Sequence, residues 1–136
     1  MIMKPGLPLL WRKTRERYNL IGTKCETCGT YYIPERKICA KCRRKGKVAP
    51  YTFSGRGKIY SYTVIRVAPE DYEFFVPYVL AIIQLEEGAY ITGQVVDVNP
   101  ESVQIGQEVE MVFRKIHDDH PEGLITYGYK FRPILK

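Results

Sequence analysis

Four cysteines, arranged as two Cys-x-x-Cys pairs, are the residues whose type and spacing point most directly to chemistry. Cys25 and Cys28 form the first pair, Cys39 and Cys42 form the second, and the chain has no other cysteine. Each pair can present two thiolates from one tight turn, so two facing turns complete a tetrahedral sulfur shell. The sequence therefore predicts a metal site with these four ligands and zinc as the expected ion.

Iron and thiol redox chemistry are the alternatives for the same four side chains. A sulfur-only site does not separate zinc from the iron of a rubredoxin-like centre, and a Cys-x-x-Cys pair can also act as a redox pair. A closed shell leaves no position for a substrate, so we expect a structural metal. Zinc binding worth about 10–16 kcal/mol would organise a segment too small to have its own core. We expect chelation to unfold residues 20–47 and to leave the remainder of the fold intact.

The residues that follow the two cysteine pairs differ. Gly29 follows the first pair and tolerates a positive φ, whereas Arg43 occupies the matching position after the second pair. The sequence therefore predicts a looser second turn.

The other candidates for catalysis are weak. Both histidines fall within residues 117–120, beside turn-forming residues, and we interpret this stretch as a polar loop. The acids Glu86, Glu87, Glu108 and Glu110 are interpreted as solvated surface charges. The sequence contains no nucleophile elbow, phosphate-binding loop or dinucleotide fingerprint. We therefore expect that the protein is not an enzyme on its own.

An amphipathic helix is predicted over residues 7–18. Apolar and aromatic side chains recur there at helical spacing, with cations on the opposite face. We expect the apolar stripe to pack against the core. The stripe consists of Leu7, Leu10, Trp11, Thr14 and Tyr18.

Positive charge is concentrated in the first part of the chain. Residues 1–50 hold 13 Lys and Arg against 3 acids, whereas residues 51–136 hold 8 against 12. Such asymmetry indicates a basic surface suited to phosphates, nucleic acid or an acidic partner. The candidates for phosphate or partner contact are Arg12, Lys13, Arg15, Arg17, Arg43, Arg44 and Lys45.

Beyond residue 58 the hydrophobic pattern changes to the period of two that is typical of strands. Five short strands are predicted, and this number favours a small Greek-key barrel of the OB type over a larger sandwich. The fold class is thus mainly β, with an N-terminal helix at 1–20, a zinc ribbon at 21–49 and an OB-fold domain at 50–136. The predicted strands cover residues 59–67, 78–85, 89–98, 108–116 and 124–131.

The order of these motifs resembles a known family. A basic helix is followed by the two cysteine pairs, by the strand entry Gly55-Arg56-Gly57-Lys58-Ile59 and by the run Ile105-Gly106-Gln107-Glu108-Val109. This arrangement is similar to the acyl-CoA-associated family that joins a rubredoxin-like zinc ribbon to an OB fold, and the similarity covers nearly the whole chain.

The resemblance implies a non-catalytic scaffold. Family membership would mean that the chain binds a thiolase-like enzyme together with hydroxymethylglutaryl-CoA synthase and helps to form a shared CoA-binding cleft. It implies CoA or an acyl-CoA as a bound ligand, in addition to structural zinc. Only the four cysteines are carried over as site residues.

Single-stranded nucleic-acid binding is the alternative function, because OB barrels can stack bases on aromatic side chains. Four tyrosines would serve, yet they lie in the acidic part of the chain, which disfavours a groove that follows a phosphate backbone. A structural adaptor without a ligand is a third possibility. The tyrosines are Tyr60, Tyr62, Tyr127 and Tyr129.

Composition and chain length set broad limits. The chain has 136 residues, of which 45% are hydrophobic and 26% charged, which excludes collagen-like and disordered classes. It contains no apolar run of membrane-spanning length and starts without the apolar segment of a secretory signal. A cytoplasmic location with reduced thiols is therefore expected.

Overall fold

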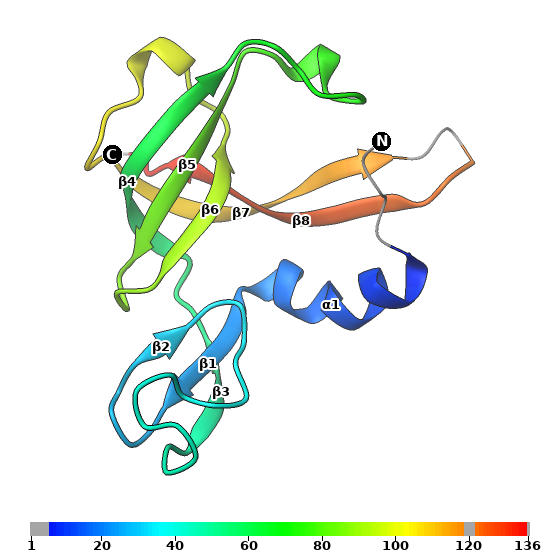
Figure 1. Cartoon of the computed structure of the whole chain (residues 1–136). Coiled ribbons are helices and arrows are strands. Elements are labelled where there is room, and N and C mark those ends of the chain that lie inside the picture. The colour runs from blue at the N-terminus through cyan, green and yellow to red at the C-terminus, as the bar shows by residue number, and fades with distance from the viewer. Residues whose placement is uncertain (1–5, 119–121, 136) are drawn as a thin grey trace.

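The computed structural model describes residues 6–118 and 122–135. It consists of a helix, a small three-stranded sheet and a five-stranded barrel, arranged in that order along the chain (Figure 1). The helix and strands are α1 (Leu7–Asn19), β1 (Ile21–Cys25), β2 (Tyr31–Tyr32), β3 (Val48–Thr52), β4 (Arg56–Ile65), β5 (Tyr78–Leu85), β6 (Tyr90–Val95), β7 (Glu108–Asp118) and β8 (Ile125–Pro133), and two short 3-10 turns lie at Glu73–Phe75 and Pro100–Ser102.

Helix α1 starts with Pro8 in its first turn, where the missing N–H costs nothing. It ends at Leu20, which adopts a left-handed conformation with φ 47° and turns the chain into β1. The prediction that the apolar stripe packs into the core is wrong, because no residue of α1 is buried. The helix lies along β8 (Figure 1) and contacts the barrel through Tyr18, whose ring meets Phe113 of β7 edge-on at 4.9 Å.

The small sheet has the antiparallel order β2-β1-β3. Gly22 permits its close packing, because a Cβ there would collide with the Tyr32 carbonyl oxygen. Strand β3 was not predicted, since Pro50 lies in its middle; Pro is tolerated there because β3 is an edge strand. The sheet extends to Thr52, which pairs with Ile21. The predicted domain division between residues 49 and 50 stays a prediction.

The barrel is closed in the order β4-β5-β6-β8-β7, which confirms the five predicted strands and the OB-type architecture. All neighbouring strands are antiparallel except β6 and β8. That parallel pair has one registered position, Val95 opposite Phe131. The barrel is therefore weakly joined along this seam.

One hydrophobic core joins the barrel to the small sheet. Leu20 and Phe53, which flank the sheet in sequence, are buried in the same cluster as the barrel residues Ile59, Ile83 and Phe131. Rings of the sheet extend this packing: Tyr51 meets Phe53 edge-on at 5.2 Å and Tyr31 at 4.9 Å. The ribbon is thus anchored by the core at one end, and its cysteines lie at the other.

Candidate functional site

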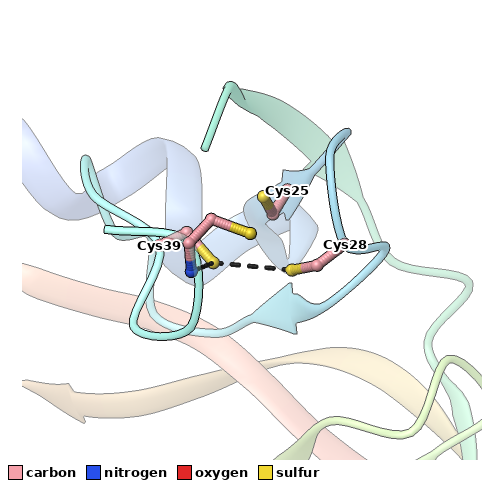
Figure 2. Close-up of side chains that lie close together, drawn as sticks. Cys25, Cys28 and Cys39 are labelled. Carbon is pink, nitrogen blue, oxygen red and sulfur yellow. Dashed lines mark hydrogen bonds between the residues drawn. The ribbon is translucent and has the colours of Figure 1, made fainter. Parts of the chain in front are cut away.

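The four cysteine sulfurs converge at the end of β1 that lies away from α1. Every pair of these atoms is within 4.8 Å, and the Cys28 and Cys39 sulfurs are 3.5 Å apart. Figure 2 shows Cys25, Cys28 and Cys39 gathered between the two turns. A tetrahedral shell with Zn–S bonds of ~2.3 Å needs sulfurs about 3.8 Å apart, so the cluster matches a zinc site in size.

Gly46 makes room for this cluster. A Cβ at that position would lie 2.8 Å from the Cβ of Cys42 and 2.9 Å from that of Cys39, and it would approach the Cys25 sulfur to 3.2 Å. Real atoms do not approach so closely without displacement, so only glycine lets the chain close behind the second pair. This cradle is a second observation that fits a four-cysteine metal centre.

The two turns have equivalent geometry. The N–H of Gly29 donates to the Cys25 carbonyl at 2.8 Å, and the N–H of Arg43 donates to the Cys39 carbonyl at the same distance. Gly29 has φ 73° and Arg43 has φ 52°, so both lie in the left-handed region. The prediction of a looser second turn is therefore wrong: Arg43 adopts the conformation that glycine would adopt, with the strain that a side chain adds there.

Hydrogen bonds and mutual repulsion set the acidity of the thiols. The backbone N–H of Cys42 and the hydroxyl of Tyr32 contact the Cys39 sulfur at 3.4 and 3.3 Å and lower the pKa of Cys39 to about 6. For Cys42, a hydrogen bond with Cys28 and partial burial both raise the pKa, to about 12. Four thiolates this close need a cation to stay deprotonated together. The donor set thus suits a metal ion better than free thiols.

The seven cations proposed for phosphate or partner contact lie in two separate places. Four lie on α1 and three in the turn after Cys42, at opposite ends of β1. Lys13 is bound by Glu16 at 2.9 Å, and Arg17 lines cavities beside β8. Among the described residues, the cations of α1 and the cations after Cys42 therefore form two separate groups and not one basic patch.

An exposed apolar surface lies where α1 meets the start of β8, and we call it the helix–hairpin surface. Trp11, the single tryptophan of the chain, is 81% exposed there, and Leu7, Leu124 and Ile125 are exposed beside it. A shallow groove of about 180 Å³ runs between these residues. The sequence identified the stripe on α1 but not its exposure, because an apolar helical face has the same sequence pattern whether it packs against a core or binds a partner.

The other sequence candidates do not assemble into a site. Tyr127 stacks on Phe113 at 5.3 Å, and Tyr60 meets Tyr90 edge-on at 5.1 Å. The four candidate tyrosines lie on β4 and β8, which β7 separates in the barrel, so they do not form one stacking platform. The interpretation of residues 117–120 as a polar loop is wrong for His117 and Asp118, which belong to β7 and pair with Thr126 and Ile125 of β8. Residues 119–120 fall outside the described residues.

The acid Glu87 is not a solvated surface charge. One carboxylate oxygen accepts a hydrogen bond from the Ser54 N–H at 2.8 Å and lies 3.5 Å from the Tyr51 hydroxyl. Its other oxygen is buried without a hydrogen-bond partner among the described residues. Glu87 therefore holds the β5–β6 turn against the connection between ribbon and barrel. Glu110 is bound by Arg132 at 2.8 Å, so it is likewise an ion-pair partner.

The fold and its four-cysteine centre define the class of protein: a zinc ribbon followed by an OB-fold barrel. Residues 12–48 match the family model of the ChsH2 rubredoxin-like zinc ribbon domain, and residues 50–114 match that of the ChsH2 C-terminal OB-fold domain. The ribbon match supports structural zinc as the metal.

The chain belongs to the family of DUF35 domain-containing scaffold proteins. It is 59% identical to such a protein of Methanocaldococcus jannaschii over 91% of this chain and 88% of the relative, and 51% identical to one of Methanothermobacter thermautotrophicus over 90% and 92%. A solved structure described as "Ltp2-ChsH2(DUF35) aldolase" superposes with a TM-score of 0.69 at 25% identity, covering 98% of each chain.

A more distant relative is described as a probable enoyl-CoA hydratase alpha subunit of Thermomonospora curvata. It is 30% identical over 73% of this chain, which corresponds to 30% of that relative. Among the described residues, no helix is long and apolar enough to span a membrane.

Proposed function

We propose that the chain is a non-catalytic scaffold that docks a thiolase-like enzyme and hydroxymethylglutaryl-CoA synthase and contributes to a CoA-binding cleft shared between them. The close relatives are named scaffold proteins, and the solved relative is described together with an aldolase. The hydratase named for the distant relative adds an association with acyl-CoA chemistry. The four cysteines hold the ribbon's zinc in this account, so they serve folding rather than catalysis.

The helix–hairpin surface carries this proposal. Trp11, Leu7 and Ile125 expose apolar area that water solvates poorly, and aromatic anchors of this kind dominate binding at protein interfaces. Arg17 lines the groove of this surface, and Arg12 and Arg15 are exposed on the same helix. A partner with an apolar centre and an acidic rim would complement both features. A second copy of the chain would bring like charges together and is disfavoured.

The cations of α1 also suit the phosphates of CoA. Arginine binds phosphate oxygens through two parallel N–H bonds, and docking through α1 would bring Arg12 and Arg15 to the edge of the partner. The cations after Cys42 lie at the far end of β1, so we assign Arg43, Arg44 and Lys45 to a second enzyme contact rather than to the same ligand. The four candidate tyrosines lie on strands that are not neighbours in the barrel, which disfavours nucleic-acid binding.

The test is reconstitution with the thiolase and the hydroxymethylglutaryl-CoA synthase of the same organism. Purified chain and enzymes are mixed, and binding is measured by size-exclusion chromatography. Trp11→Glu, which places a charge in the helix–hairpin surface, is expected to weaken binding of one enzyme at least tenfold. Ile105→Glu is the matched control, because Ile105 is also exposed but lies at the other end of the barrel.

Two outcomes would contradict the proposal. The first is that neither enzyme binds the unmodified chain. The second is that the Trp11→Glu variant binds both enzymes as tightly as the unmodified chain does. Titration of CoA into the assembled complex and into the separate proteins then tests the shared cleft, which requires tighter CoA binding in the complex.

A further inference from the structure

A cavity of about 460 Å³ opens where β6 and β8 separate. The two strands pair at Val95 and Phe131 and diverge toward their N-terminal ends, with the Tyr129 hydroxyl donating to the Thr92 carbonyl at 3.4 Å. This volume lies in the range of small-molecule sites. Four tyrosines and two cations are among the residues that line it: Tyr72, Tyr78, Tyr127, Tyr129, Arg17 and Lys130.

Lys130 is the unusual residue of this cavity. It is only 7% exposed, and its amine lies 5.8 Å from the centre of the Phe75 ring. No carboxylate pairs with it within residues 6–118 and 122–135, and none of the residues that line the cavity is Asp or Glu. Burial and the nearby Arg114 both lower the pKa of Lys130. Arg114 is itself held by Asp97 at 2.6 Å, so that carboxylate is already engaged.

A buried ammonium group without a counterion is costly, and lysine is almost never buried unless it is paired. The Phe75 ring offsets part of this cost through a cation–π contact. Arg17 reaches the same cavity from α1, so two cations from separate elements line a space that contains no described acid. An anion that enters the cavity would supply the missing charge.

We propose that this cavity binds an organic anion with a flat or aromatic body. Lys130 supplies the positive charge for its carboxylate or phosphate group, Arg17 adds positive charge to the same cavity, and the rings of Tyr72 and Tyr78 contact its body. The site lies within one chain, so it goes beyond the scaffold role and does not require an enzyme partner.

Phenyl phosphate, benzoate and benzyl alcohol are suitable probes, because they share a ring and differ in charge. Each is titrated at millimolar concentration into the zinc-loaded full chain, and backbone amide NMR shifts are recorded. The anions are expected to shift amides at 92–94 and 126–130, whereas benzyl alcohol is expected to bind at least tenfold more weakly. Stronger binding of phenyl phosphate indicates a phosphate ligand and stronger binding of benzoate a carboxylate ligand; either result supports the site.

Lys130→Met tests the residue itself. It is expected to weaken binding of both anions at least tenfold and to raise the melting temperature of the ligand-free chain, because an unpaired buried charge is removed. Lys115→Met is the control: Lys115 lies on the neighbouring strand, exposed and bound to Asp118 at 2.8 Å. Equal binding of the neutral probe, absence of binding, unchanged affinity in Lys130→Met, or a lower melting temperature of that variant would each overturn the proposal.

Discussion

At the residue scale, the metal centre depends on two backbone positions as much as on its ligands. Arg43 completes the second turn with a positive φ, which costs a residue with a Cβ about 1–2 kcal/mol. Gly46 leaves space that a methyl group would fill. The ligands were evident from the sequence because cysteine spacing is local. The strain at Arg43 and the close approach at Gly46 depend on how the two turns face one another.

Arg43→Gly is expected to stabilise the zinc-loaded ribbon by roughly 1 kcal/mol, because glycine adopts this conformation without strain. The measurement is the rate of zinc loss to a chelator, which should fall. Arg44→Gly removes the same charge from the neighbouring exposed position and should give no such gain. A faster loss of zinc from Arg43→Gly would show that the arginine side chain, rather than its backbone, stabilises the turn.

Gly46→Ala is expected to remove most zinc binding. The added methyl group would collide with Cys39 and Cys42, which cannot both move aside and remain ligands. Metal content after dialysis, measured by mass spectrometry, should fall well below one ion per chain. Gly29→Ala is the comparison, since nothing lies within 4 Å of its Cβ position; it should retain zinc at a cost of about 1 kcal/mol. Full zinc content in Gly46→Ala would contradict this account.

At the scale of the element, α1 leaves part of its apolar stripe exposed: Leu7 and Trp11 are exposed, whereas Leu10, Thr14 and Tyr18 are half-buried. The helix contacts β7 and β8 through Tyr18 near its C-terminal end, and Trp11 in its first half remains in solvent. Isolated helices of this length are marginal in water. We therefore expect α1 to gain order when a partner covers it.

Trp11 reports directly on this element because it is the single tryptophan of the chain. The free protein is expected to show the red-shifted emission of a solvated indole, and emission should shift to the blue when the enzyme partner binds. Binding without any shift would place the interface elsewhere, for example on the turns around the metal. A blue-shifted free protein would show that Trp11 is already covered.

At the scale of the whole molecule, the ribbon and the barrel share one core but differ in what stabilises them. Leu20 and Phe53 connect the ribbon to the barrel core, and Glu87 bonds to the connecting segment. The outer ribbon, including Cys28 and Cys42, has no such core. Zinc binding is therefore expected to stabilise the cysteine end of the ribbon more than the barrel.

Chelation should unfold the outer ribbon while the barrel stays folded with reduced stability. Hydrogen exchange is expected to rise in residues 23–47 and to stay slow in β5, which lies between β4 and β6 in the sheet. Leu20 should retain partial protection because it is buried in the shared core. Cooperative loss of protection throughout the chain would show that the ribbon and barrel are one unit.

The sequence predicted the helix and strands better than the tertiary contacts that their side chains make. Alternating residues identified the five barrel strands, yet Pro50 concealed β3, whose pairing with β1 is tertiary. Alternation also put Lys130 on the polar face of its strand, where the segment around Phe75 covers it. Glu87 looked like a turn residue because its partners, Tyr51 and Ser54, lie far away in the sequence. Local patterns cannot show which neighbours the fold will bring.

The central claim is that this chain bridges two enzymes, and native mass spectrometry of the reconstituted mixture tests it most directly. The thiolase, the hydroxymethylglutaryl-CoA synthase and the zinc-loaded chain are measured together and in each pairwise combination. The account predicts an assembly that contains both enzymes when the chain is present and none when it is omitted. Association of the two enzymes without the chain, or failure of the chain to join them, would contradict it.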